Sequence, residues 1–254
     1  MRLFALVITL LIPLAVLAVE PVGKPIRLSN DLVVQPLTEH VWLHRSWTEY
    51  NGQRVSSNGV IIDDGKTLTL IDTAWGEAPT ATLLSWIEQH FGKDPDQAIL
   101  THSHDDRMGG SRLLAEKHIR AYVHPKTLSI VKAEPGKYYD PASHFPQALA
   151  FHDRRARLGD IELYYPGAAH SPDNIVIWYG RDHLLVGGCA VKGRESTNIG
   201  YVAGSAPDHW AAAMDNLIQA FPQAAMVVPG HGQLGDEQLL FHTRALATQA
   251  LERR

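Results

Sequence analysis

Short apolar runs alternate with amphipathic segments along most of the chain. Residues 41–47 and 55–62 are two apolar runs on either side of Asn51-Gly52, a pair of residues typical of tight turns, so we expect a β-hairpin there. Residues 68–72 predict the next strand. A helix is expected after it, because four apolar residues recur at helical spacing before a terminating glycine: Leu83, Leu84, Ile87 and Phe91, followed by Gly92.

The same alternation continues to the end of the chain. Further strands are predicted at residues 98–100, 121–123, 175–179, 184–186 and 225–228, with a hairpin at 157–165. Further helices are predicted at residues 111–118, around the apolar face of Trp210, Met214, Leu217 and Phe221, and from about 236 to 251. This mixture indicates an α/β fold in which helices cover the sheets and loops at strand ends carry the chemistry.

Composition places the chain among ordinary globular proteins. It has 254 residues, of which 45% are hydrophobic and 20% charged, enough to bury a sizeable core. The net charge of -4 provides no basic field that would attract nucleic acid, so we expect no nucleic-acid partner. Without repeats or a long linker, residues 19–254 are expected to form a single domain, with a monomer as the default state.

The first residues have the features of a secretory signal peptide. A short positive region at Arg2 is followed by an apolar run over residues 3–17, which is too short to span a bilayer, and small residues stand before a cleavage site after Ala18. We therefore expect residues 1–18 to be removed and the mature protein to be periplasmic, without a membrane association. The alternative is an uncleaved membrane anchor.

Residues of the types that bind metal ions follow several of the predicted strands. The sequence "THSHDDRMGG" places His102, His104 and Asp106 directly after the strand that ends at Leu100. Three further candidates follow later strands: His170, Cys189 and His231. Imidazole, carboxylate and thiolate are the ligands that zinc prefers, and three protein ligands per ion leave a position for water. Six such residues would suit two ions.

Each candidate taken alone also has an ordinary structural interpretation. An isolated histidine is commonly a surface or hydrogen-bonded core residue, and Cys189 alone is a small buried hydrophobe. Because Cys189 is the single cysteine, no internal disulfide can form, and an exported free thiol is a liability unless a metal holds it. The remaining histidines lack a comparable context and are interpreted as structural: His40, His44, His90, His118, His124, His144, His152, His183, His209 and His242.

The candidate residues lie in motifs that resemble those of the metallo-β-lactamases, specifically the di-zinc subclass with a cysteine ligand. The motifs are "THSHDDRMGG", "YYPGAAHSPDNIVIW", "LLVGGCAVK" and "VVPGHG", in this order, together with "LIDTAWG" and "SSNGVII". The similarity covers residues 31–248. His-x-His-x-Asp alone marks only the wider hydrolase superfamily, whereas the "GGC" motif is much narrower.

This resemblance implies a four-layer αββα sandwich with the site along one edge of two sheets. One zinc would be held by His102, His104 and His170, and a second zinc by Asp106, Cys189 and His231. A hydroxide between the ions would attack the carbonyl of a β-lactam, the small-molecule substrate, and Asp106 would orient it. The second zinc would stabilise the amide nitrogen as the ring opens. The expected outcome is hydrolysis of penicillins, cephalosporins and carbapenems, and hence antibiotic resistance.

Other site roles follow from the same resemblance. Asp72 corresponds to an aspartate that would orient a ligand histidine, with a turn cap as the alternative. Arg107 would neutralise acidic charge beneath the second metal, while Lys192, with Arg194 as a substitute, would bind the substrate carboxylate. Where many relatives have an asparagine that polarises the lactam carbonyl, this chain has Tyr201, and Asn198 lies three residues earlier. Trp47 or Tyr50 on the hairpin would cover the substrate.

Two other functions are compatible with parts of the pattern. Thioesterases, lactonases and RNA-processing nucleases share the superfamily and the first histidine pair, but they usually have a histidine after the aspartate and a bridging aspartate in place of the cysteine. Here Arg107 and Cys189 occupy those positions. A periplasmic zinc-binding protein without catalysis is the other alternative, and its site should have closed coordination.

Overall fold

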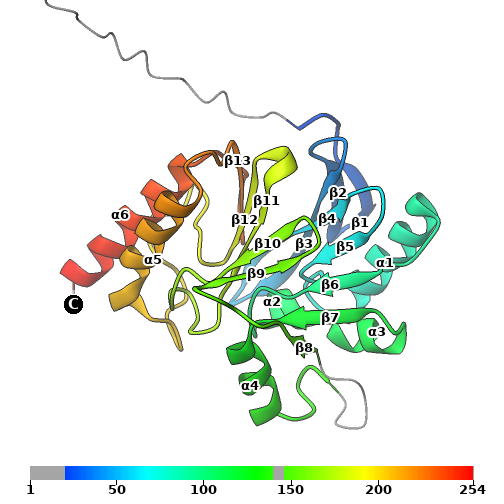
Figure 1. Cartoon of the computed structure of the whole chain (residues 1–254), viewed down its shortest axis with the longest axis horizontal. Helices are drawn as coiled ribbons and strands as arrows, with labels where there is room; N and C mark the ends of the chain where they lie inside the picture. The colour runs from blue at the N-terminus through cyan, green and yellow to red at the C-terminus, as the bar shows by residue number, and fades with distance from the viewer. Residues whose placement is uncertain (1–20, 140–145, 254) are drawn as a thin grey trace, which may run out of the picture.

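Two β-sheets face each other in the computed structural model, which describes residues 21–139 and 146–253 (Figure 1). The expected signal peptide lies outside these residues. One sheet has eight strands, in the order β1 (Ile26–Ser29), β2 (Leu32–Pro36), β3 (Val41–Tyr50), β4 (Gln53–Asp63), β5 (Leu68–Ile71), β6 (Gln97–Ile99), β7 (Arg120–Val123) and β8 (Gln147–Ala148). The other has five, in the order β13 (Met226–Pro229), β12 (Leu184–Gly188), β11 (Val176–Tyr179), β10 (Ile161–Tyr164) and β9 (Arg155–Leu158).

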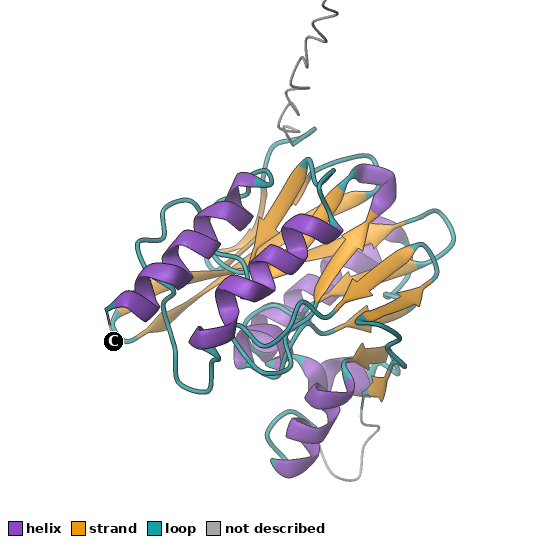
Figure 2. Cartoon of the chain, turned by 60° about the vertical axis from the view of Figure 1, so that its left-hand side comes forward, coloured by secondary structure: helices purple, strands orange, loops and turns teal. Residues whose placement is uncertain are grey.

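Helices cover the outer face of each sheet. The first sheet is flanked by α1 (Glu77–Phe91) and α3 (Ser111–Glu116), and the second by α5 (Pro207–Ala220) and α6 (Gln238–Glu252), which lie side by side in Figure 2. Three further short segments lie between successive strands of the same sheet: α2 (Asp105–Met108), α4 (Pro125–Ala133) and the 3₁₀ turn η1 (Gly180–Asp182). No helix in the described ranges is long and apolar enough to span a lipid bilayer.

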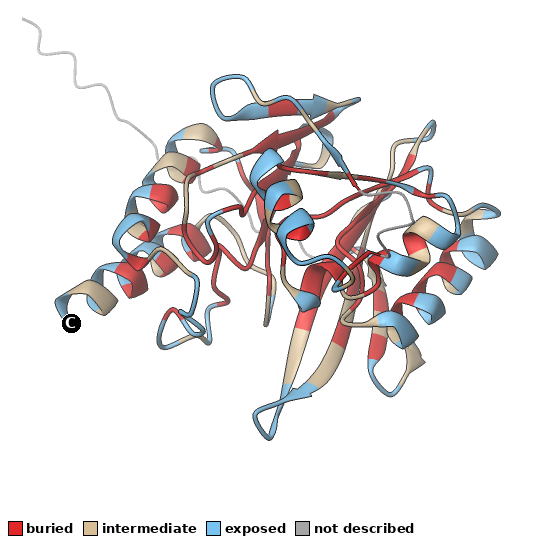
Figure 3. Ribbon diagram, turned by 90° about the horizontal axis from the view of Figure 1, so that it is seen from below, coloured by how far each residue is buried: buried red, intermediate tan, exposed pale blue. Residues whose placement is uncertain are grey.

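The alternation of side chains along the strands builds the layers. On β4, Val60 and Ile62 point into the cluster between the two sheets, whereas Ile61 packs with the α1 side chains. On β11, Ile177 joins the same inter-sheet cluster and Trp178 packs towards α5. The buried residues in Figure 3 accordingly follow the strands and the inner helix faces. The expected four-layer αββα sandwich is confirmed.

Most of the expected elements are present, with differences at their ends. The hairpin around Asn51-Gly52 is longer than expected, because β3 and β4 pair from Val41 with Ile62 as far as Tyr50 with Gln53. The helix expected at 111–118 ends at Glu116, and His118 adopts a left-handed φ of 55° that a helix cannot continue. The strands β1, β2 and β8 and the helix α4 were not predicted, since they are short and partly exposed.

Strand direction brings the candidate residues to one edge. In the first sheet β5, β6 and β7 are mutually parallel, and in the second β10 and β12 both run antiparallel to β11, while β12 is parallel to β13. The two sheets meet at this edge, where Asn58 on β4 donates from its backbone N–H to the carbonyl of Gly230 at 2.9 Å and from Nδ2 to the carbonyl of Pro229 at 2.9 Å. Loops that follow different strands therefore converge there.

Candidate metal centre

Three imidazoles converge at the end of β6 and the loop after β10. His102 Nε2 lies 3.1 Å from His104 Nδ1, which in turn lies 3.0 Å from His170 Nε2. The ring centroids are 4.6 to 4.9 Å apart and the rings stand nearly perpendicular. We call these residues the imidazole cluster. His102 and His170 are buried, whereas His104 is partly exposed on the open side.

A carboxylate, a thiol and a fourth imidazole converge beside this cluster. Cys189 Sγ lies 3.1 Å from Asp106 Oδ2 and 3.2 Å from His231 Nε2, and the distance from His231 Nε2 to Asp106 Oδ2 is 3.3 Å. We call these residues the thiol cluster. His102 belongs to a group of donor atoms within 4.8 Å of one another that also contains Cys189, so the two clusters are neighbours.

The donor geometry fits metal ions. Two nitrogens bound to one tetrahedral zinc at about 2.0–2.1 Å lie about 3.3 Å apart, close to the separations within the imidazole cluster. Neutral imidazole nitrogens that present lone pairs to one another at this distance repel, and a cation shared between them would remove that repulsion. The thiol cluster combines sulfur, nitrogen and carboxylate oxygen, a donor set that suits zinc. Each cluster offers three protein ligands, which leaves room for water.

Burial changes the pKa values of the side chains in both clusters. It lowers the pKa of His102 to about 3 and that of His231 to about 4, so both rings are neutral at pH 7 and keep a free lone pair. Burial alone would raise the pKa of Asp106, but the positive charge of Arg107 beside it holds the pKa well below its ordinary value. Burial raises the pKa of the Cys189 thiol. A bound cation would instead favour the thiolate.

Arg107 lies directly beneath the thiol cluster and is completely buried. Its Nε donates to Asp106 Oδ2 at 3.0 Å, and its Nη2 donates to Cys189 Sγ at 3.0 Å and to the carbonyl of Gly230 at 2.7 Å. Burial would lower the pKa of this guanidinium, but the neighbouring Asp106, Cys189 and Asp72 together raise it. Arg107 therefore contacts two of the three residues that the sequence assigned to the second metal.

Comparisons with known proteins agree with this geometry. The family model of the metallo-beta-lactamase superfamily matches residues 52–231. The chain belongs to this superfamily. A metallo-beta-lactamase type 2 from Bacillus sp. (strain 170) is 35% identical over 217 residues, which cover 85% of this chain and 82% of that protein. Another, from Bacteroides fragilis, is 31% identical over 255 residues, covering 99% and 98%.

A solved structure leads to the same family. The structure of the DIM-1 metallo-beta-lactamase matches with a TM-score of 0.79 at 32% sequence identity, over 87% of this chain and 98% of that one. The family resemblance expected from the motifs is therefore confirmed, and so is the enzyme class, a hydrolase of the β-lactamase type.

Asp72 does not contact a ligand histidine in this member of the metallo-β-lactamase superfamily. Its Oδ1 accepts the backbone N–H of Thr101 at 2.7 Å, its Oδ2 accepts the Thr101 hydroxyl at 2.9 Å, and Arg107 Nη1 lies 3.4 Å from Oδ2. The residue adopts a left-handed φ of 61°. These contacts match the alternative expectation, a turn cap. Asp72 holds Thr101 at the start of the loop that follows β6.

Lys192 lies beside both clusters with its side chain buried. Its Nζ stands 5.0 Å from the centre of the Trp210 ring and has no hydrogen-bond or ion-pair partner in the described part of the chain. Burial lowers the pKa of this amine, while the nearby Cys189 and Asp106 oppose that effect. Arg194, considered as its substitute, is exposed and lies 3.9 Å from Asp236.

The two candidates for polarising a carbonyl occupy different positions. Tyr201 is 52% exposed, and its ring centroid lies 6.2 Å from that of His104, on the open side of the imidazole cluster. Asn198 is exposed, and its Oδ1 accepts the backbone N–H of Gly200 at 2.8 Å. The structure therefore brings Tyr201 to the centre, whereas the side chain of Asn198 supports its own turn.

Two aromatic side chains lie next to the thiol cluster, on the side of His231. Tyr50, at the tip of the β3–β4 hairpin, lies 6.2 Å from Trp75, and Trp75 lies 6.0 Å from His231, measured between ring centroids. Trp47 instead carries the guanidinium of Arg54 at 5.0 Å above its ring. The motif analysis missed Trp75, although it belongs to the "DTAWG" stretch after β5.

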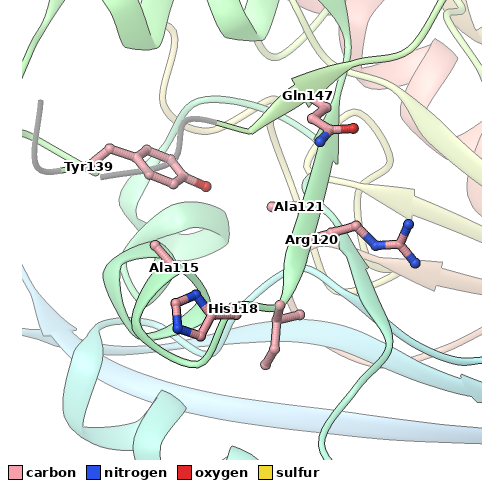
Figure 4. Close-up of a pocket in the computed structure, with 7 residues that line it drawn as sticks. Ala115, His118, Arg120, Ala121, Tyr139 and Gln147 are labelled. Carbon is pink, nitrogen blue, oxygen red and sulfur yellow. The ribbon is translucent and has the colours of Figure 1, made fainter. Parts of the chain in front are cut away.

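A separate cavity of about 180 Å³ lies between α3, β7 and β8 (Figure 4). It is lined by Ala115, His118, Ile119, Arg120, Ala121, Tyr139 and Gln147. None of the six donor residues borders it. This cavity is therefore separate from the metal centre.

Proposed function

We propose that this protein is a zinc-dependent β-lactamase that opens the lactam ring of penicillins, cephalosporins and carbapenems and so confers antibiotic resistance. Its signal peptide, residues 1–18, directs it to the periplasm, where residues 19–254 act as a single-domain monomer. The observation that carries the proposal is the buried ammonium of Lys192, which lies over the Trp210 ring beside two neighbouring clusters of metal-binding side chains and has no ion-pair partner among the described residues. A buried cation without an ion-pair partner is unfavourable unless a bound anion neutralises its charge.

The proposed metal ligands are the six donors of the two clusters. His102, His104 and His170 hold one zinc ion, and Asp106, Cys189 and His231 hold the other. When bound, zinc supplies a nucleophile at neutral pH by lowering the pKa of its water from about 15.7 to about 7, and it acts as a Lewis acid towards charge that develops in the transition state.

The chain's own residues bind and orient the substrate. Almost every β-lactam carries a carboxylate next to the lactam nitrogen, and Lys192 Nζ provides the matching charge at the side of the centre. Tyr201 stands on the open side, next to His104, where its hydroxyl can donate to the lactam carbonyl. Tyr50 and Trp75 form an aromatic wall on the other side, which excludes water from the bound ring.

Asp106 has a second role in the proposed reaction. Its Oδ2 is held by Arg107 and Cys189, and the low pKa keeps the carboxylate ionised at neutral pH. Its Oδ1 makes no hydrogen bond to the described residues, so it can accept a hydrogen bond from the attacking water and orient that water towards the carbonyl carbon.

The test is chelator-sensitive lactam hydrolysis by the mature chain. Zinc content is measured first, and turnover of a penicillin, a cephalosporin and a carbapenem is then assayed before chelation, after chelation and after zinc is restored, with a glutathione thioester in parallel. We expect lactam hydrolysis that disappears with zinc and returns with it. Two bound zinc ions without lactam hydrolysis would favour a zinc-binding protein, and thioester turnover alone would favour a thioesterase.

A further inference from the structure

The turn that follows His231 is held by side chains from other segments of the chain. Ser56 on β4 has its carbonyl oxygen 2.5 Å from His231 Nδ1, and its hydroxyl accepts the backbone N–H of Gly232 at 3.2 Å. Asn58, on the same strand, donates from Nδ2 to the carbonyl oxygen of Gly232 at 3.0 Å. These contacts fix one side of the turn, and two charged side chains contact the peptide group that comes next, between Gly232 and Gln233.

The two charges stand at opposite ends of that peptide group. Arg45 on β3 donates from Nη2 to the carbonyl oxygen of Gly232 at 2.9 Å and from Nε to Asn58 Oδ1 at 2.7 Å. Glu195, in the segment after β12, accepts the backbone N–H of Gln233 at 3.0 Å. The cation therefore lies at the negative end of the peptide dipole and the anion at its positive end. We call Arg45 and Glu195 the peptide clamp.

The clamp acts where the backbone has few steric restrictions. Gly232 adopts a left-handed φ of 81°, and a Cβ atom at this position would collide with Glu195 Oε1. Because glycine rotates at little steric cost, the following peptide group needs other contacts to fix its orientation. A rotation that exchanges its oxygen and its N–H would place the oxygen against the Glu195 carboxylate and the N–H against the Arg45 guanidinium. Both contacts would be repulsive, so the clamp favours a single orientation.

The clamp residues come from two distant parts of the chain. Arg45 is partly buried; burial lowers the pKa of its guanidinium, and the charge of Glu195 opposes that effect. Glu195 follows Lys192 by three residues. Neither clamp residue belongs to a motif on which the family resemblance rests. The turn after His231 therefore links the hairpin strand to the segment that begins at the proposed substrate-binding lysine.

We propose that Arg45 and Glu195 are positioning residues that fix the peptide group after His231 and thereby set the metal affinity of the thiol cluster. A displaced turn would move His231 Nε2, which lies 3.2 Å from Cys189 Sγ. The imidazole cluster takes no residue from this turn, so its affinity is independent of the clamp. The proposal rests on the zinc binding of the proposed function, but not on the identity of the substrate.

Arg45→Met removes the donors of the clamp and keeps an unbranched side chain. We expect it to weaken metal binding at the thiol cluster about tenfold, the lower end of the range for outer partners of metal ligands, and to change the imidazole cluster less than about threefold. The matched control is Arg54→Met on the same hairpin, where the guanidinium donates to the carbonyl oxygen of Asn30 at 2.6 Å and to Asp31 Oδ1 at 2.9 Å. This control should change neither affinity.

Two substitutions test the acceptor of the clamp. Glu195→Gln keeps an oxygen that can accept the Gln233 N–H, whereas Glu195→Ala removes it. We expect the affinity of the thiol cluster to fall about tenfold in Glu195→Ala and less than about threefold in Glu195→Gln. Equal losses in these two variants would overturn the hydrogen-bonding role of Glu195.

Cobalt(II) titration measures the two clusters separately and without any substrate. Absorption from the cobalt–thiolate bond reports the thiol cluster, and the d–d bands that grow without it report the imidazole cluster; zinc competition then yields each affinity. In Arg45→Met and Glu195→Ala, the thiolate band should appear only at higher cobalt while the imidazole cluster fills as before. An unchanged thiol cluster, or equal weakening of both clusters, would overturn the proposal.

A second measurement needs no variant, in case Arg45→Met does not fold. In a crystal structure of the unaltered zinc-loaded protein, we expect a distance of about 2.7–3.2 Å between Arg45 Nη2 and the Gly232 oxygen. The same range is expected between the Gln233 nitrogen and a carboxylate oxygen of Glu195. A rotated peptide group, or either side chain turned to solvent, would overturn the proposal. Neither readout involves a β-lactam, so a protein that binds two zinc ions with the clamp intact but hydrolyses no lactam would contradict only the proposed substrate.

Discussion

Arg107 donates from Nη2 to the sulfur of Cys189 at 3.0 Å, and both side chains are buried at the edge where the two sheets meet. The same guanidinium donates through Nε to Asp106. One cation therefore holds two of the three donors of the thiol cluster in position. It also offsets the negative charge that the cluster carries when the thiol is ionised.

Replacing this cation should destabilise the protein before any metal is bound. In Arg107→Met, Asp106 keeps its charge in a buried site without its main partner, so we expect the free energy of unfolding of the zinc-free protein to fall by about 3–5 kcal/mol. Urea unfolding measures this change. The control is Arg244→Met, which removes an exposed ion pair with Asp215 and should cost less than about 1 kcal/mol. Similar losses in both variants would argue against the role of Arg107.

Cys189→Ser should remove metal from the thiol cluster while the imidazole cluster stays filled. A serine hydroxyl ionises far less readily than a thiol, so it is a poor zinc ligand at neutral pH. We expect the zinc content to fall from two ions towards one, and turnover of a carbapenem to fall at least about tenfold. Elemental analysis and steady-state kinetics check this. Two tightly bound zinc ions in the serine variant would show that the sulfur is not a ligand.

Lys192→Ala should weaken binding of substrates that carry a carboxylate. Loss of a charge-assisted contact of about 1.5–3 kcal/mol predicts a rise in KM of about 10- to 150-fold, with a smaller effect on kcat. A cephalosporin whose carboxylate is esterified should not distinguish the variant from the unaltered protein. The matched control is Lys66→Ala, which removes an exposed lysine in the turn between β4 and β5. An equal KM for the free acid in both variants would contradict the prediction.

Tyr201→Phe tests the hydroxyl separately from the ring. If the hydroxyl donates to the lactam carbonyl as charge develops on it, kcat should fall at least about tenfold, towards the 10²-fold loss seen when one such donor is removed. Asn198→Ala should change kcat less than about threefold, because its Oδ1 bonds to the Gly200 N–H. A larger loss in Asn198→Ala than in Tyr201→Phe would reverse the assignment of these two residues.

Packing between the sheets should dominate stability. Ile177 is fully buried in the inter-sheet cluster, so Ile177→Ala should lower the free energy of unfolding by about 2–5 kcal/mol. Ile26→Ala makes the same chemical change on β1, where the side chain is 43% exposed, and should cost less than about 1 kcal/mol. Thermal or urea unfolding of both variants measures the difference.

Several parts of the fold were predictable because they depend on local pattern. The apolar alternation in β4 determines which side chains face each layer, and the Asn51-Gly52 pair marks the turn of its hairpin. The edge strand β1 and the helix α4 escaped prediction, since β1 exposes half of its positions and α4 buries only two residues. Elements with so little buried surface leave a weak hydrophobic pattern.

The sequence by itself determined the types of donor side chain, their places after successive strands and, through its motifs, the family. Only the tertiary structure decided which atoms meet: that Arg107 joins Asp106 to Cys189, that Asp72 caps Thr101, and that Asp173 accepts the backbone N–H of Ser103. The reason is that donor identity and strand pattern are short-range properties of the chain. Contacts between loops 29 to 82 residues apart depend instead on strand order, on register and on how the two sheets pack.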